Sequence, residues 1–356
     1  MPEPDVCIVG GGPAGLSAAI ALSLAGKSVR VLETNRPPID KACGEGLMPD
    51  TLEALHALGI RLSGGFPLRG IRFISAGTKA QADFTNGHGL GLRRTLLHQA
   101  LIARASELNI DLHWNTPHGF PRDARLLVGA DGQNSRIRRA EGFSQKQVSC
   151  RYGFRCHYAL EPWCEYVEVY WDKRRQIYVT PVAPDQIDVA LLTHNPPERL
   201  QNVLPHFPAL FARLQNARRV SSEMGALTTT RVLRNVCRDH LALIGDASGS
   251  VDAITGEGIG LAVRQAIALA EALRKGDLAA YEVSHRRIMR RPRIMAKLLL
   301  LMSRSTALQK IVIPVFARAP LVFDALLAAH VCSGTVTAAA LTGPSLPNPD
   351  RLKIQS

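Results

Sequence analysis

The sequence predicts an α/β fold with a parallel sheet, a mostly antiparallel sheet as a second domain and a helical carboxyl-terminal region. Short apolar runs at residues 6–9, 126–128 and 241–244 are bounded by glycine or polar residues, as is typical of parallel strands buried on both faces. Between residues 148 and 230, strand-like segments alternate with prolines, which favours an antiparallel sheet. After residue 278 the pattern becomes helical and basic.

The composition excludes several classes of protein. A chain of 356 residues with 46% hydrophobic and 21% charged residues is long enough for about two globular domains. Aromatic residues make up only 5%, which disfavours stacking on single-stranded nucleic acid. We expect no transmembrane helix, because no stretch of 18 apolar residues occurs, and no signal peptide. The seven cysteines lack paired spacing, which indicates free thiols in a reducing cytoplasm.

The first apolar run leads into a glycine-rich turn and then into a helix rich in Ala and Leu. In Gly10-x-Gly12-x-x-Gly15, the first glycine allows a tight turn, the second lets a pyrophosphate approach, and the third lets helix and strand pack closely. The helix amino terminus offers free N–H groups to phosphates. Glu33 ends the next strand and can accept hydrogen bonds from a ribose. This Rossmann-type unit predicts cofactor contacts from Gly10, Gly12, Pro13, Ala14, Gly15 and Glu33.

The remaining elements follow from local spacing. Residues 34–49 form a loop with several prolines and glycines, and Asp50 is a candidate cap for a short helix over residues 51–58. Residues 71–84 predict a strand pair of another sheet, and residues 94–108 have helical spacing. Further strands are expected at residues 166–171, 176–180 and 187–192, and a further helix at 258–273.

Two more motifs follow the glycine-rich turn in a fixed order. The segment Leu126–Arg138 contains Gly129-Ala130-Asp131-Gly132, and Leu241–Ala247 is followed by Thr255–Leu261. With the first motif, they resemble the fingerprints of the FAD-dependent monooxygenase superfamily, whose best-known fold is that of the aromatic hydroxylases. The resemblance covers about residues 5–275, is weak in the central sheet and is absent from the tail.

The resemblance implies roles for particular residues. Asp246 would hydrogen-bond the ribityl chain of FAD, and the helix from Gly258 would direct its amino terminus at the flavin, which suits an anionic reduced flavin. Asp131 would lie near the flavin and pyrophosphate. Arg94 matches the superfamily's helix-start arginine that reaches the cofactor, with Arg93 as the alternative and a solvated helix start as the simpler interpretation. The cofactor contacts implied in this way are Cys43, Gly44, Arg94, Asp131, Gly245, Asp246, Gly256, Gly258 and Ile259.

The resemblance also implies a domain division. The FAD-binding domain would be discontinuous, over residues 1–60, 91–147 and 233–277. The substrate-binding sheet domain would take residues 61–90 and 148–232, and the basic helical region residues 278–356. Only residues 110–125 separate the helix from the second motif, so we expect a hairpin shorter than the superfamily's usual one. No second Gly-x-Gly-x-x-Gly unit occurs, which implies that NAD(P)H binds only transiently.

The loop Lys41–Pro49 indicates a branch of the superfamily. Its Cys43-Gly44 pair, with the later Thr255-Gly256-Glu257-Gly258, is similar to the geranylgeranyl-reductase-like branch, although related loops occur in hydroxylases of secondary metabolism. Cys43 is a candidate catalytic residue that could tune the flavin or donate a proton, or it could be an inert buried thiol. Glu45 is a second candidate, as an acid or base. A helix cap or surface salt bridge is the favoured interpretation of Glu45.

Apolar and aromatic residues in the central strands predict a pocket for a lipophilic or aromatic substrate. The predicted pocket residues are Tyr166, Val169, Trp171, Tyr178, Thr180 and Pro181, of which half could be plain core. His157 and His194 have no evident partner and receive no role. No tryptophan lies in a Trp-x-Trp-x-Ile-Pro motif, so halogenation is disfavoured. No metal motif occurs, so no metal site is predicted.

The favoured function is an FAD-dependent, NAD(P)H-consuming monooxygenase that hydroxylates a lipophilic or aromatic small molecule through a flavin C4a-hydroperoxide. One alternative is a flavin-dependent reductase of carbon–carbon double bonds in a prenyl chain. Another is a flavoprotein that acts on or binds a protein or membrane partner. The net charge of +13 and nine basic residues without Asp or Glu over residues 283–322 motivate peripheral contact of 286–318 with an anionic membrane, or a solvated face. We expect a cytoplasmic enzyme without nucleic-acid binding, because no recognition motif accompanies the charge.

Overall fold

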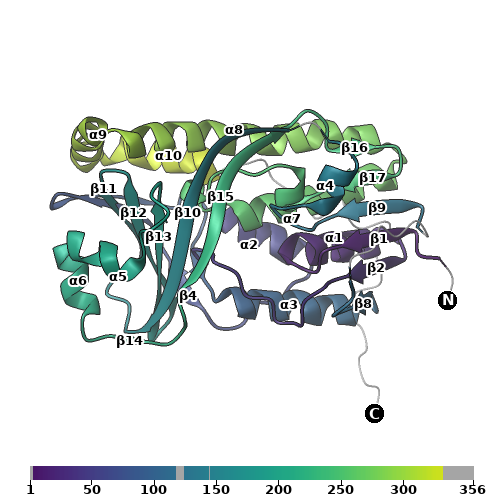
Figure 1. Cartoon of the computed structure of the whole chain (residues 1–356), viewed down its shortest axis with the longest axis horizontal. Coiled ribbons are helices and arrows are strands. Elements are labelled where there is room, and N and C mark those ends of the chain that lie inside the picture. Colours follow the sequence, from purple (N-terminus) through teal and green to yellow (C-terminus); the bar gives the residue numbers. More distant parts are fainter. Residues whose placement is uncertain (1–2, 118–123, 144, 332–356) are drawn as a thin grey trace, which may run out of the picture.

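The computed structural model describes residues 3–117, 124–143 and 145–331. Within these residues, a parallel sheet with its helices lies beside a larger sheet, and a long helix runs along one edge of both (Figure 1). The predicted α/β architecture with a helical carboxyl-terminal region is confirmed. No single helix of the described residues is long and apolar enough to cross a membrane, although α8 (Leu278–Arg304) and α9 (Thr306–Arg318), bent by 116°, pass that test as a pair.

The parallel sheet positions the glycine-rich turn. Its strand order is β16-β17-β9-β1-β2-β8, and only β16 runs antiparallel to its neighbour. Every residue of β1 is buried, as the continuous apolar run predicted. The strands are β1 (Val6–Val9), β2 (Val29–Leu32), β8 (Asp111–His113), β9 (Leu126–Gly129), β16 (Cys237–Arg238) and β17 (Leu241–Leu243).

Helix α1 (Pro13–Leu24) connects β1 to β2 and packs against α3 (Arg94–Glu107) and α7 (Gly258–Arg274). The prediction that Asp50 caps a helix over residues 51–58 is wrong. Helix α2 (Pro49–Ala57) begins earlier with Met48 at its N-cap, because the fixed φ of a proline suits the first helical position. Asp50 lies in the first turn and pairs with Arg264 of α7.

The larger sheet has the strand order β14-β10-β13-β12-β11-β5-β6, with β15 paired to β10. All its pairs are antiparallel except β11 with β5. Its strands are β5 (Gly70–Ser75), β6 (Thr78–Asp83), β10 (Gln145–Ala159), β11 (Tyr166–Asp172), β12 (Arg175–Ala183), β13 (Gln186–Thr193), β14 (Arg218–Arg219) and β15 (Met224–Leu233). A small sheet of β3 (Gly46–Leu47), β7 (Gly89–Gly91) and β4 (Phe66–Leu68) packs on β12.

The two faces of the larger sheet have different neighbours. On one face, α5 (Leu200–Val203) and α6 (Pro208–Leu214) bury an apolar cluster against β10, β12 and β13. Toward the other face lie α8, α9 and α10 (Pro320–Val331), with Phe73, Trp171, Phe323 and Leu327 in one core cluster. Because side chains alternate along a strand, β11, β12 and β13 each contribute to both clusters.

A buried ion pair joins the larger sheet to the loop that follows β17. Arg151 of β10 donates from Nη2 to Asp252 Oδ1 (2.5 Å) and from Nε to Oδ2 (3.1 Å), and from Nη1 to Gln176 Oε1 (2.6 Å). Both side chains of the pair are fully buried. The short helix η3 (Ala253–Thr255) begins at Asp252, whose carboxylate also accepts from the N–H of Ile254. The pair therefore fixes this loop on the sheet.

We expect Arg151→Met to lower the free energy of unfolding by about 3–5 kcal/mol, because it leaves the buried Asp252 carboxylate without its counter-charge. Urea unfolding followed by circular dichroism measures the change. The control is Arg69→Met, which removes the solvent-exposed pair Arg69–Asp83 and should hardly alter the midpoint. Equal shifts for the two variants would contradict the assignment.

Candidate active site

A cavity of about 440 Å³ lies where the two sheets meet. Its wall contains the turn after β1, the loop over residues 41–48, strands β11 to β13, the loop over residues 245–259, and the inward sides of α8 and α10. Eleven of the fifteen predicted cofactor contacts line it: Gly12, Pro13, Ala14, Cys43, Gly44, Arg94, Gly245, Asp246, Gly256, Gly258 and Ile259. The cavity thus gathers residues from all three motifs.

Two glycines of the first motif serve close packing. A Cβ on Gly15 would lie 1.8 Å from the Gly10 carbonyl oxygen, and Gly10, at φ +114°, would place one 2.3 Å from the Ala130 oxygen. Because of these clashes, a side chain on either glycine would push β1, α1 and β9 apart. Neither glycine lines the cavity. A Cβ on Gly12, by contrast, would meet nothing within 4 Å, which leaves room for a ligand beside the turn.

Two helix amino termini face the cavity without a capping side chain. Helix α1 begins after Gly12 and α7 after Glu257, and neither N-cap side chain accepts a hydrogen bond from its helix. The first N–H groups of a helix have no partner within the helix, and they attract negative charge. Open space also lies beside Gly44 and Gly258. The residues present therefore fit an extended anionic group such as FAD.

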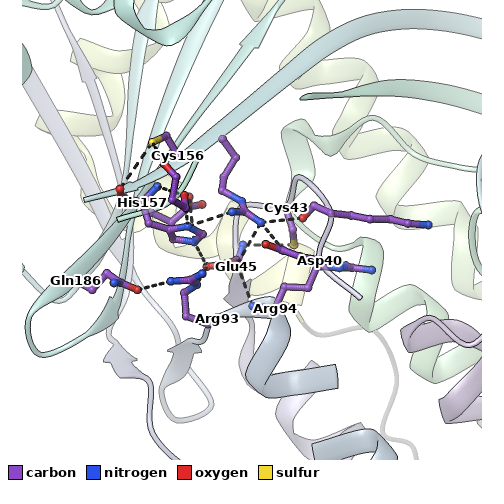
Figure 2. A network of polar contacts seen from close by, with 12 residues as sticks. Asp40, Cys43, Glu45, Arg93, Arg94, Cys156, His157 and Gln186 are labelled. Carbon is purple, nitrogen blue, oxygen red and sulfur yellow. Dashed lines mark hydrogen bonds and ion pairs between the residues drawn. The ribbon is translucent and has the colours of Figure 1, made fainter. Parts of the chain in front are cut away.

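Arg94 rather than Arg93 reaches the cavity. Arg94 lines the wall, and its Nε has no hydrogen-bond partner among the described residues. Arg93 instead donates from Nη1 to Gln186 Oε1 (2.7 Å), with its Nε 3.8 Å from Glu45 Oε2 (Figure 2). Asp246 also opens to the cavity; burial raises the pKa of its carboxyl group, which the positive charges of Arg94 and Lys41 oppose.

Glu33 and Asp131, by contrast, lie outside the cavity wall. Glu33 Oε2 accepts from the N–H of Gly11 (2.7 Å) and Oε1 from that of Asn35 (2.8 Å). Burial acts to raise the pKa of Glu33, but these hydrogen bonds outweigh it and lower the pKa. Asp131 Oδ2 accepts from the N–H of Arg136 (2.7 Å), which fixes the start of α4 (Arg136–Ala140). Both carboxylates hold backbone in place.

Two further side chains, which sequence reasoning missed, hold the cofactor-facing turns. His98 of α3 donates from Nε2 to the Gly11 oxygen (2.8 Å) and accepts at Nδ1 from the N–H of Ile39 (3.2 Å). Arg138 donates from Nη1 to the carbonyl oxygens of Asp246 and Ala247 (both 3.1 Å), and burial lowers its pKa to about 10. The signal for Arg138 was its place at the end of the second motif.

The favoured interpretation of Glu45 as a surface residue is wrong. Its side chain is buried and lies at the centre of a polar network (Figure 2). Oε1 accepts from the N–H of Arg94 (2.9 Å) and lies 3.9 Å from Arg155 Nη2, while Oε2 lies 2.8 Å from His157 Nε2. The loop folds inward here because the first turn of α3 and two arginines offer donors to one carboxylate.

His157, which the sequence left without a partner, belongs to this network. Its Nδ1 lies 3.0 Å from Arg155 Nη1 and 2.9 Å from Ser221 Oγ. Because a guanidinium only donates, Nδ1 is the acceptor. Nε2 therefore carries the proton and donates it in a hydrogen bond to Glu45 Oε2. Burial lowers the pKa of His157, so the imidazole is neutral at pH 7. His194 lies outside this network, and burial also lowers its pKa.

Asp188 lies beside His157, with 3.7 Å between Oδ1 and Nε2, and burial raises its pKa well above the usual range. One carboxylate or imidazole ligand atom from each of Glu45, His157 and Asp188 lies within 4.8 Å of the other two, which is close enough for the three to hold a metal ion. However, the guanidinium groups of Arg93 and Arg155 already balance the Glu45 charge. The charge of Glu45 is therefore balanced by the chain's own cations, whereas neither oxygen of the buried Asp188 carboxyl has a hydrogen-bond partner among the described residues.

Four of the six predicted pocket residues line the cavity: Val169, Trp171, Tyr178 and Thr180. The predictions for Tyr166 and Pro181 are wrong. Side chains alternate along a strand, so Tyr166 and Pro181 point to the opposite face from their pocket-lining neighbours. Tyr166 donates its hydroxyl to Asp83 Oδ1 (2.8 Å). Tyr178 donates to the Ile254 oxygen (3.0 Å), which holds its ring in the wall.

Helices α8 and α10 contribute a wall that the sequence reasoning missed. The lining residues from these helices are Met295, Leu299, Phe323, Leu326, Leu327 and His330. Met295 and Leu299 are four residues apart, as are Phe323 and Leu327, which places each pair on one helix face. This spacing is the sequence signal that could have identified them.

Comparison with known proteins agrees with this geometry. Residues 3–119 match the family model described as an FAD binding domain. The menaquinone reductase of Mycobacterium tuberculosis strain H37Rv is 26% identical over 77% of this chain and 78% of its own length. An FAD-dependent monooxygenase of Nectria sp is 27% identical over 79% of this chain and 80% of its own length. The structure of the flavin-dependent brominase Bmp2 shares the fold, with a TM-score of 0.79, 18% identity and coverage of 93% and 94% of the two chains.

The resemblance to the FAD-dependent monooxygenases is confirmed, because residues 3–119 match an FAD binding domain and two relatives of 26–27% identity over more than three quarters of the chain are named as monooxygenases. The chain is an FAD-dependent oxidoreductase, and the predicted flavin cofactor is confirmed.

We expect Arg94→Met to raise the dissociation constant for FAD by about tenfold or more, because a hydrogen bond to a charged group contributes about 1.5–3 kcal/mol. Quenching of FAD fluorescence on titration into the apoprotein measures the constant. Arg93→Met is the matched control, since its guanidinium binds Gln186 outside the cavity wall. A larger effect in the Arg93 variant would reverse the assignment.

The thiols provide a second test. Cys43 lies in the cavity wall, where burial raises its pKa, so it is a neutral thiol at pH 7. We expect iodoacetamide to modify the exposed Cys150 at least tenfold faster than Cys43, because the thiolate is the reactive form. Peptide mapping by mass spectrometry after timed quenching measures both rates. Faster labelling of Cys43 would instead indicate an activated thiolate.

Proposed function

We propose that the chain is an NAD(P)H-consuming monooxygenase that hydroxylates a lipophilic or aromatic small molecule. One observation carries this proposal: a single cavity combines cofactor-facing backbone on one side with an apolar, aromatic wall on the other. FAD, when bound, supplies the redox chemistry with nicotinamide and oxygen. Relatives named as monooxygenases support this reading, as does the absence from the chain of a second dinucleotide motif.

In this proposal the first, second and third motifs hold the cofactor. The amino terminus of α1 beside Gly12 binds the pyrophosphate, and Arg94 and Asp246 bind from opposite sides of the cavity. The uncapped amino terminus of α7 faces the flavin and favours negative charge on it. Gly44 and Gly258 leave room for close approach of the ring.

The apolar wall positions the substrate and excludes water. Phe73, Val169 and Trp171 from the sheet pack in one cluster with Phe323 and Leu327 from α10, and all five line the cavity. These walls offer few polar groups, so binding selects apolar or aromatic molecules by shape. Exclusion of water strengthens each electrostatic contact within the site.

Glu45 is proposed as the group that exchanges protons with the cavity. It lines the wall and receives the Nε2 proton of His157, whose Nδ1 faces the half-buried Ser221. Ser221 Oγ and Arg155 Nη1 both donate to Nδ1, which keeps the imidazole proton on Nε2, where it is directed at Glu45 Oε2. Loss of the Ser221 hydroxyl would weaken this orientation and alter how readily Glu45 gains and loses its own proton.

We expect Ser221→Ala to slow the proton-dependent part of turnover by about tenfold and to shift its pH profile, without changing FAD affinity. Ser222→Ala is the matched control, because this exposed neighbour makes no hydrogen bond to His157. Steady-state rates from pH 5.5 to 9, in H₂O and D₂O, measure the effect. Identical profiles for both variants would assign the network a structural role alone.

The function itself is tested by anaerobic mixing of the purified holoprotein with NADPH and then NADH. We expect one nucleotide to bleach the flavin absorbance, and air to restore it with release of hydrogen peroxide. Aromatic and lipophilic compounds are then screened for faster bleaching and for hydroxylated product. If neither nucleotide reduces a flavin that dithionite does reduce, the electrons come from another donor and the proposal fails.

A second candidate is a reductase of carbon–carbon double bonds in a prenyl chain. The protonated Cys43 thiol in the cavity wall favours it, because such a reaction needs a proton donor near the flavin. The relatives named as reductases include menaquinone reductases and a digeranylgeranylglycerophospholipid reductase that is 30% identical over 39% of this chain.

Cys43→Ser separates the two candidates. For the monooxygenase we expect oxygen-dependent NAD(P)H oxidation to stay within about twofold of the unsubstituted enzyme. For the reductase, saturation of a prenyl substrate under anaerobic conditions would fall by tenfold or more in the same variant. Product mass distinguishes them directly, since hydroxylation adds 16 Da and saturation adds 2 Da per double bond.

A further inference from the structure

Helices α8, α9 and α10 present an unusual outer surface, which we call the apolar-basic face. Of the twelve large hydrophobic side chains exposed among the described residues, eight lie on these three helices. Their exposed fractions run from 46% for Val315 to 82% for Leu321. The eight residues are Val283, Ile294, Leu298, Leu301, Ile311, Val315, Leu321 and Val322. Such a concentration marks an interaction surface rather than scattered surface residues.

The spacing of these residues forms continuous stripes. Ile294, Leu298 and Leu301 follow at i, i+4 and i+7 on one face of α8, and Ile311 and Val315 at i, i+4 on α9. The three helices lie together at one edge of the molecule (Figure 1). The stripes therefore share one side of the protein.

Basic side chains surround the apolar stripes. No Asp or Glu occurs over residues 283–322, so this stretch carries charge of one sign. Exposed basic residues on α8 and α9 include Arg287, Arg290, Lys297, Arg304, Lys310 and Arg318. Apolar side chains amid Lys and Arg are typical of helices that lie in the interface of an anionic bilayer.

We propose that the apolar-basic face docks the protein on the surface of an anionic lipid bilayer. The basic side chains contact lipid phosphates, and the apolar stripes enter the boundary between headgroups and acyl chains. A lipid surface suits this face, because its exposed Lys and Arg residues match the anionic phosphates of such a bilayer in charge. Docking is peripheral, because exposed basic residues recur along α8 and α9 and keep both helices at the level of the lipid phosphates.

The same helices also form a wall of the cavity. Met295 and Leu299 line the cavity next to Ile294 and Leu298, which are exposed on the outer side of α8. On α10, Phe323 lines the cavity beside the exposed Val322. A lipophilic substrate dissolved in the bilayer would therefore have a short path into the site between α8 and α10. This path rests on the proposed function, whereas docking does not.

Vesicle flotation tests the docking. We expect the holoprotein to float with vesicles of phosphatidylcholine containing 30 mol% phosphatidylglycerol at 50 mM salt. Binding should fall at least tenfold with pure phosphatidylcholine vesicles, and severalfold at 500 mM salt because salt screens the charges.

Two pairs of substitutions locate the surface. We expect Leu298→Ser with Leu301→Ser, and separately Arg290→Glu with Lys297→Glu, to lower the partition coefficient at least tenfold. The controls are Val148→Ser with Phe211→Ser, and Lys79→Glu with Lys146→Glu, which change exposed residues elsewhere and should bind as before. Flavin absorbance and circular dichroism confirm that each variant is folded.

Absence of flotation at low salt, or equal loss in variants and controls, would overturn the proposal. So would a stable dimer that light scattering detects and that Leu298→Ser with Leu301→Ser dissociates, because a second copy would then cover the face. Vesicle binding needs no turnover, and anaerobic flavin reduction needs no vesicles. Failure of the docking and failure of the proposed function are therefore distinguishable.

Discussion

The arrangement of the site depends on one buried carboxylate that joins the two sheets. Glu45 receives the first N–H of α3 from the nucleotide-binding side and the imidazole of His157 from the larger sheet. Its backbone has a φ of +53°, which a glutamate adopts only when its surroundings compensate for the strain. The hydrogen bonds to both sheets provide that compensation. They hold Cys43 and Gly44 in the cavity wall, where the cofactor-facing loop has to lie.

A second constraint is that the elements around the cavity are two-sided. Because side chains alternate along β11 and β12, some face the cavity and the others face an outer apolar core. The helical period divides α8 between cavity-lining Met295 and Leu299 and the exposed Ile294 and Leu298. One wall thus has cavity-lining residues on its inner side and the apolar-basic face on its outer side. Changes on the outer side need not disturb the chemistry inside.

Local patterns made much of the fold predictable. The glycine spacing, the buried apolar strands and the helix beginning at Gly258 depend on neighbours in sequence, and the structure has them at the predicted places. The pocket was partly predictable: Val169 and Trp171 line it, but Tyr166 has the opposite parity and faces away. The alternation of side chains along a strand can be predicted from the sequence. Which of the two faces lines the cavity depends on what packs against the sheet.

The sequence by itself determined the class of cofactor site, because the strand, the glycine spacing and the helix that form the first motif are neighbours in the chain. It also determined where positive charge accumulates. Only the tertiary structure decided that Glu45 is buried, that His157 has partners, and that α10 closes the pocket. These contacts join residues more than a hundred positions apart. Their formation depends on how the two sheets dock, which no local spacing encodes.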